Sequence, residues 1–182
     1  MSIPTPALDA LRDGLPDECK DTRLNLSSVL ASEHLEPGRA FGVALAAARF
    51  VRAQRLAAAV ESDARAGLGE AVAALVSDAL AAASLMAMNT VYYRFRHMVG
   101  KESYQSRPPR LRMSRMAQPA TDKQSFELMS LGCAALAGCE QCIQSHEASL
   151  LHLGATEEAC HDAVRIAAVI HAAAVGLDAR PA

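Results

Sequence analysis

Two cysteines and a histidine in the second half of the chain have the spacing of a redox site. Cys139, Cys142 and His146 form the pattern Cys-x-x-Cys-x-x-x-His. On an α-helix, residues three and four apart share a face, so Cys142 would lie beside both Cys139 and His146. Cys142 then has a potential disulfide partner on one side and a potential proton acceptor on the other. The three residues predict thiol–disulfide chemistry.

A cysteine attacks as its thiolate, and an ordinary thiol, with a pKa of ~8.5, is mostly protonated at neutral pH. Two features favour the thiolate here. Gly138 is expected to end one helix, which leaves Cys139 and Cys142 in the first turn of the next, where free amides and the helix dipole favour negative charge. His146, one turn beyond Cys142, can accept its proton.

Glu127 is the acidic residue that precedes this motif, twelve residues before Cys139. If Gly138 closes an antiparallel hairpin, a rise of about 1.5 Å per residue would leave Glu127 far from Cys139. The spacing alone therefore does not assign Glu127 to the site.

A zinc site is the alternative interpretation of the cysteine pair. A structural zinc site usually has four ligands in two spaced pairs, but no second pair follows here, so Cys133, Cys160 or His161 would have to complete it. The chain has five cysteines, and an odd number in a reducing compartment favours a catalytic or metal-binding pair over a structural disulfide framework.

The composition of the 182 residues limits the possible functions. Hydrophobic residues make up 51% of the chain and aromatic residues only 4%, so the core must be built from alanine, leucine, valine and methionine. The net charge of −2 argues against a nucleic-acid-binding protein, which is typically strongly basic. No signal peptide is visible, and no uninterrupted apolar run approaches the ~20 residues of a membrane span. We expect a cytoplasmic protein with no membrane segment.

Helical patterns dominate and no β-type alternation appears, so the sequence predicts an all-α fold. The expected helices are 6–13, 16–31, 37–50, 52–66, 69–88, 90–99, 120–137, 139–153 and 156–177. An irregular segment rich in proline and arginine, 100–119, should join two distantly similar helical halves, about 1–100 and 119–182, of a single domain, 1–182. Its basic residues and the nearby aromatic side chains are expected to form a subunit interface or a solvated surface.

The motif and its surroundings resemble the alkyl hydroperoxide reductase AhpD family, within the carboxymuconolactone decarboxylase-like superfamily. The resemblance covers nearly the full length. It is carried by Phe126-Glu127-Leu128-x-Ser130, Gly138-Cys139-x-x-Cys142-x-x-x-His146-Glu147, Asn25-Leu26-Ser27-Ser28-Val29, Met86-x-Met88-Asn89-x-Val91-Tyr92-Tyr93-Arg94 and Leu111-Arg112-Met113.

The resemblance implies an all-helical thiol peroxidase without a bound cofactor or metal. It implies that Cys142 meets the hydroperoxide and becomes a sulfenic acid, that Cys139 is the resolving cysteine and proton donor, and that His146 and Glu127 form a proton relay. It also implies a homotrimer, reduction by dihydrolipoyl groups on the acyltransferase of a 2-oxo acid dehydrogenase complex, and an AhpC peroxiredoxin as a partner to be reduced.

One position departs from the family pattern. Members often have a histidine immediately before the second cysteine, where this chain has Gln141, which cannot carry a proton at neutral pH. We therefore expect slower turnover or a shifted pH optimum. Two other functions stay open at this stage: a dithiol redox sensor or zinc-binding regulatory module without turnover, and a lyase of the decarboxylase branch that would not need the cysteines.

Overall fold

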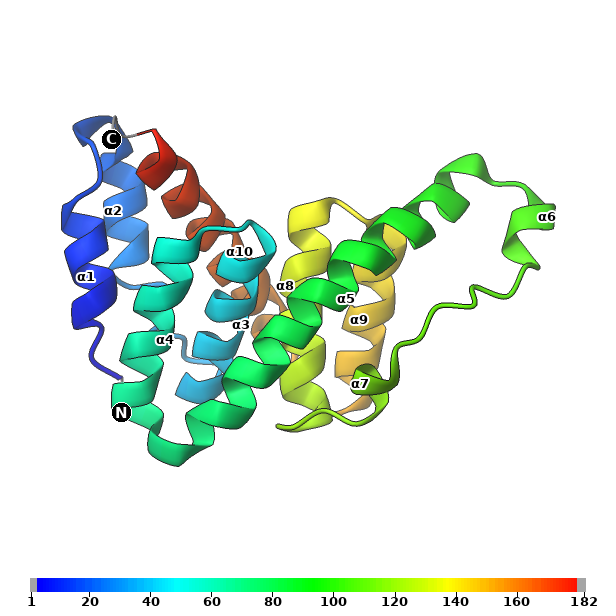
Figure 1. The fold of residues 1–182 in the computed structure, drawn as a ribbon, viewed down its shortest axis with the longest axis horizontal. Coiled ribbons are helices and arrows are strands. Elements are labelled where there is room, and N and C mark those ends of the chain that lie inside the picture. The colour runs from blue at the N-terminus through cyan, green and yellow to red at the C-terminus, as the bar shows by residue number, and fades with distance from the viewer. Residues whose placement is uncertain (1–2, 180–182) are drawn as a thin grey trace.

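Helices make up the regular structure of the chain. The computed structural model describes residues 3–179, and within that range every regular element is helical, as predicted (Figure 1). In chain order the elements are α1 (Pro6–Asp13), η1 (Asp17–Cys19), α2 (Lys20–Leu26), α3 (Pro37–Phe50), α4 (Gln54–Leu68), η2 (Gly69–Ala71), α5 (Val72–Val99), α6 (Glu102–Gln105), α7 (Ser114–Ala117), α8 (Lys123–Ala137), α9 (Glu140–His152) and α10 (Glu157–Asp178).

Helix α3 lies at the centre of the bundle. It packs against α4, α5, α8 and α10, and residues 40–48 are all buried. Alanine and glycine make up most of that stretch, which lets the neighbouring helices approach closely. At Gly132 of α8, an added Cβ would lie 3.2 Å from Val43 of α3 and 3.3 Å from Ala167 of α10. The small side chains therefore set the spacing of α3 and α10 from α8.

Helix α5 is a single helix where the sequence predicted two, 69–88 and 90–99. The predicted break at Asn89 is wrong because Asn89 is buried, and tertiary packing overrides its low helix propensity. The hydroxyl of Thr90 donates to the carbonyl of Met86 at 2.7 Å, so it too is satisfied within the helix. The helix ends at Gly100, which adopts a left-handed conformation with φ of 65°.

The predicted helix 16–31 is also wrong in its extent. It begins as the short η1 and continues as α2, which ends at Leu26. The hydroxyl of Ser27 donates to the carbonyl of Leu24 at 2.7 Å, and that of Ser28 to the carbonyl of Asn25 at 3.5 Å. Serine side chains that bind nearby carbonyls in this way compete with regular helical bonding, which favours an end at this point.

The segment between α5 and α8 projects from the bundle as an arm (Figure 1). It is irregular, as predicted for 100–119, apart from the one-turn helices α6 and α7. The end of the arm, where the chain rejoins the bundle, is fixed by hydrogen bonds to Asp78, a fully buried residue of α5. The carboxylate of Asp78 accepts hydrogen bonds from Arg115 at 2.8 Å and from the backbone amides of Ala120 at 3.0 Å and Thr121 at 2.7 Å. Asp78 therefore determines where the chain enters α8.

Two helical stretches, Gln54–Val99 and Glu157–Asp178, are long and apolar enough to cross a membrane by length and composition alone. The expectation of no membrane segment, which was based on uninterrupted apolar runs, did not anticipate them. Both α5 and α10 pack against α3 and α8, and core helices of soluble proteins share this composition. The cytoplasmic location and the division of one domain into two similar halves stay predictions.

Candidate active site

The cysteine pair lies at the turn between α8 and α9. Helix α8 ends at Gly138, whose left-handed conformation, with φ of 62°, closes the helix as predicted. Cys139 is the N-cap residue of α9, and Cys142 falls in the first turn of that helix. Both sulfur atoms therefore belong to the helix end where unpaired amides and the helix dipole favour a negative charge.

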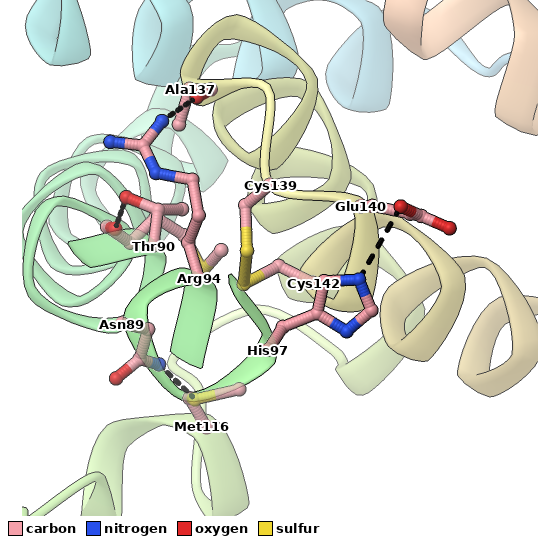
Figure 2. Close-up of a disulfide and its surroundings, with 10 residues drawn as sticks. Asn89, Thr90, Arg94, His97, Met116, Ala137, Cys139, Glu140 and Cys142 are labelled. Atoms are coloured by element: carbon pink, nitrogen blue, oxygen red, sulfur yellow. Dashed lines mark hydrogen bonds and ion pairs between the residues drawn. A yellow bond between two sulfur atoms is a disulfide. The ribbon is translucent and has the colours of Figure 1, made fainter. Parts of the chain in front are cut away.

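Cys139 and Cys142 are joined by a disulfide, with 5.3 Å between their Cα atoms (Figure 2). Their exposure differs. Cys139 is fully buried, whereas Cys142 is 5% exposed and lines a cavity of about 490 Å³. A molecule that enters this cavity therefore meets Cys142 first.

His146 lines the same cavity as Cys142, one helical turn further along α9. Its Nδ1 lies 2.5 Å from Oε2 of Glu127 on α8. Both side chains are buried. A carboxylate can only accept a hydrogen bond, so an ionised Glu127 requires a proton on Nδ1 of His146. When the ring is neutral, Nε2 then carries no proton and can accept one. A base for Cys142 needs this tautomer.

Lys123 holds the other oxygen of the same carboxylate. Its Nζ lies 2.8 Å from Oε1 of Glu127 and donates a second hydrogen bond, at 2.6 Å, to the main-chain carbonyl of Met116. Our interpretation of the sequence missed Lys123, although Lys123 and Glu127 have the four-residue spacing at which opposite charges meet on a helix.

The carboxyl group of Glu127 remains ionised despite its burial. Burial alone would raise its pKa, but the hydrogen bonds from His146 and Lys123, with their positive charges, hold the pKa of Glu127 below its usual range. The site therefore keeps a negative charge behind His146 at neutral pH.

The register of the α8–α9 hairpin explains how Glu127 reaches the site. Glu127 lies eleven residues before Gly138 and His146 lies eight residues after it. In an antiparallel hairpin these positions differ by about one helical turn, a separation that two side chains can bridge. Glu127 is far from Cys139 along the hairpin, as its spacing predicted, but its register places it opposite His146.

The cavity wall comes from four elements. Cys142 and His146 belong to α9, and the remaining lining residues are Asn89 and Tyr93 of α5, Met113, Met116 and Ala117 of the arm, Lys123 of α8, and Gln141 and Ser145 of α9. The side-chain amide of Asn89 donates to the sulfur of Met116 at 3.7 Å (Figure 2). The two methionines, Ala117 and Tyr93 offer apolar contacts to a reactant, and most of the other lining side chains are polar. A larger hollow, of about 880 Å³, lies among residues 3–9 and 26–41 and contains none of the predicted site residues.

Helix α5 also places two basic side chains beside the disulfide (Figure 2). Arg94 donates to the carbonyl of Ala137 at 2.5 Å, in the last turn of α8. His97 lies 3.5 Å from Glu140, the residue between Cys139 and Gln141. Both contacts tie α5 to the turn that carries the cysteines.

The other cysteines lie apart from this cavity. Burial raises the pKa of the Cys133 thiol, and burial together with Glu147 and Glu157 raises that of Cys160. Cys133 and Cys160 are both buried and fit packing roles. Within residues 3–179, no three histidine, cysteine or acidic side chains gather closely enough to hold a metal ion, so the zinc interpretation gains no ligand set there.

Comparison with known proteins supports the same family. Residues 103–182 match the model of the carboxymuconolactone decarboxylase family. The chain is 54% identical to the alkyl hydroperoxide reductase AhpD of Anaeromyxobacter dehalogenans (strain 2CP-C), over 94% of this chain and 91% of that protein. It is 44% identical to the protein of the same name from Rhodospirillum centenum, over 97% of this chain and 93% of that protein.

The chain belongs to the alkyl hydroperoxide reductase AhpD family.

Membership of the AhpD family confirms the resemblance seen in the sequence. The structure brings together the four predicted site residues. Cys139 and Cys142 lie at the start of α9, His146 lies one turn further along the same helix, and Glu127 of α8 contacts His146. Gln141, at the position where the resemblance led us to expect a histidine, also lines the cavity. Its position there makes the substitution relevant to the chemistry at Cys142.

Proposed function

We propose that the protein is a thiol-dependent peroxidase that reduces hydroperoxides through Cys139 and Cys142. One observation carries this proposal most directly. The more exposed sulfur of the disulfide, that of Cys142, lines the same cavity as His146, whose ring is oriented by a buried carboxylate. The names of the relatives, alkyl hydroperoxide reductase, support peroxide reduction as the general activity.

The proposed cycle begins with the reduced pair. His146 takes the proton of Cys142, and Glu127 stabilises the charge on the ring. The thiolate attacks the terminal oxygen of the hydroperoxide, so the O–O bond breaks, Cys142 becomes a sulfenic acid and the alkoxide takes a proton from Cys139. The thiolate of Cys139 then attacks the sulfur of Cys142, which forms the disulfide and releases hydroxide. The hydroxide takes the proton held by His146 and leaves as water, so the ring is neutral again.

A dithiol must reduce the disulfide before the next cycle. We propose a dihydrolipoyl group, carried by the acyltransferase of a 2-oxo acid dehydrogenase complex, as the electron donor. Its flexible apolar chain fits a cavity lined by Tyr93, Met113 and Met116, and its thiolate would attack Cys142, the sulfur within reach. An AhpC peroxiredoxin, the partner implied by the family, could accept electrons from the reduced pair by the same exchange.

A homotrimer is the third part of the proposal. The outer face of α5 exposes Val91, Phe95 and Met98, the last to 77%, beside a hollow of about 480 Å³. An apolar helix face next to a projecting arm is typical of a surface that another subunit covers. A second copy of the chain is the partner that the family resemblance favours.

Steady-state kinetics with dihydrolipoamide and cumene hydroperoxide test the proposed function. We expect continuous hydroperoxide-dependent oxidation of the dithiol by the wild type. Activity should be lost in Cys142→Ser and Cys139→Ser but retained in Cys19→Ser, the matched control outside the site. A single stoichiometric oxidation would instead indicate the redox sensor. Physiological activity that survives Cys142→Ser would favour the lyase.

A further inference from the structure

We propose that Lys123 is a further positioning residue of the active site. It keeps Glu127 charged and oriented, so that His146 holds its proton on Nδ1 and presents Nε2 to Cys142. This inference rests on the proposed function, because it assigns Lys123 to the relay behind the same cysteine.

The two oxygens of Glu127 have separate partners. Oε2 lies 2.5 Å from His146, and Oε1 lies 2.8 Å from Lys123. The lysine is itself held, because its ammonium group also donates to the carbonyl of Met116. The carboxylate is thus held by Lys123 of its own helix, α8, and by His146 of α9, and it cannot rotate without losing a charge-assisted hydrogen bond.

The charge of Lys123 stabilises the ionised form of Glu127 in a way that His146 alone cannot. The side chain of Glu127 is only 4% exposed, so burial opposes its ionisation. If His146 were the only cationic partner, the carboxylate would be stabilised best when the ring is already protonated, and a protonated ring cannot act as a base. Lys123 is a second cationic partner of the same carboxylate, so the ionisation of Glu127 does not depend on a protonated His146 ring.

Among residues 3–179, the ion pairs made by Glu127 are those with Lys123 and His146. Lys123 from α8 and His146 from α9 are the charged side chains that act on Glu127. The nearby Asp122 is occupied as the N-cap of α8, where it accepts from Ser125, and it pairs with Arg39 of α3 at 3.6 Å. From the arm, the uncharged main-chain carbonyl of Met116 accepts a hydrogen bond from Lys123.

Replacing Lys123 by methionine tests the inference, because methionine keeps the aliphatic stem and removes the charge. We expect the pH at which Glu127 gains a proton to rise by about one to two units, because one charge-assisted hydrogen bond is lost. Infrared spectroscopy can follow the protonated carboxyl band, assigned to Glu127 by its absence in Glu127→Gln. Lys123→Arg should restore most of the shift, and Lys20→Met, on the exposed surface of α2, should cause none.

A second readout links the titration to the cysteine. At pH values below the raised midpoint of Glu127 protonation, alkylation of reduced Cys142 should be slower in Lys123→Met than in the wild type. Lys123→Arg should show no such slowing. Should the methionine variant fail to fold, Lys123→Gln serves in its place. An unchanged Glu127 midpoint in the neutral variant would overturn the role of Lys123. Neither measurement needs turnover, so a protein that titrates as expected but does not reduce hydroperoxides would refute only the proposed function.

Discussion

Replacing Glu127 by glutamine should disable His146 as a base while hardly changing the shape of the site. Lys123 has only donors, so the amide oxygen of the new side chain must face it, at the position where Oε1 now lies 2.8 Å away. The amide nitrogen then faces Nδ1 of His146 and donates to it. The ring is forced into the other tautomer, with its proton on Nε2, and cannot accept the proton of Cys142.

The size of this effect follows from the contact that is lost. Glu127 is buried, and its bond to His146 is short, at 2.5 Å. A hydrogen bond to a charged group contributes about 1.5–3 kcal/mol, and about 1.4 kcal/mol corresponds to a factor of ten. We therefore expect the rate at which Cys142 reacts with iodoacetamide near pH 7 to fall by about 10- to 100-fold.

The assay uses the Cys139→Ser background, in which Cys142 cannot form the internal disulfide. Site-specific alkylation of Cys142 is followed by mass spectrometry as a function of pH, with and without Glu127→Gln. Glu147→Gln is the matched control, because it removes the same charge from the residue next to His146 without breaking a hydrogen bond to it. A Glu127 variant that reacts like its parent, or a control that slows Cys142 equally, would contradict the role of Glu127 in setting the tautomer of His146.

Three further changes test the scaffold. Asp78→Asn should lower the free energy of unfolding at pH 7 by about 3 kcal/mol, because a buried, fully paired carboxylate is lost. Burial alone would raise the pKa of Asp78, but hydrogen bonds from Ala120, Thr121 and Arg115 hold that pKa below its usual value. The ionised carboxylate therefore stabilises the fold fully above the unfolded pKa of ~3.9. This stabilisation is lost as the pH falls through the lower pKa of the folded protein. Urea titrations of both proteins should therefore converge only below about pH 4. Gly132→Val should cost about 1–3 kcal/mol by crowding Val43 and Ala167, and equal stability in a urea titration would contradict the packing. Phe95→Asp should reduce the sedimentation coefficient if another subunit covers α5, and an unchanged value would exclude that face as the interface.

Local signals were sufficient to predict most helices. Pro37 begins α3 and Gly138 ends α8 as expected, because proline suits the first helical position and glycine the left-handed residue after the last. Thr156 caps α10 by accepting from the amide of Ala159. These features depend on residues within one turn of the helix end, so the sequence alone can reveal them.

The errors arose where distant contacts decide the structure. Asn89 looked like a helix break, but it is buried in the cavity wall, where the bundle keeps α5 continuous. The path of the arm depends on hydrogen bonds from Ala120 and Thr121 to Asp78, more than forty residues earlier in the chain. Spacing along the chain does not show such contacts.

The candidate site was predicted in part for the same reason. Cys139, Cys142 and His146 lie within eight residues of one helix and its cap, so their proximity follows from helical geometry. Glu127 was assigned only through the family resemblance, because its approach to His146 depends on the register of the hairpin. The methionines of the arm became visible only in the fold, whereas the pairing of Lys123 with Glu127 could have been predicted from their four-residue spacing.

Trapping the sulfenic acid on Cys142 tests the central claim most directly. The Cys139→Ser protein, reduced and then treated with one equivalent of cumene hydroperoxide in the presence of dimedone, should carry a single dimedone adduct, located on Cys142 by peptide mass spectrometry. Consumption of the hydroperoxide without an adduct on Cys142, or with the adduct on Cys19, would contradict the account.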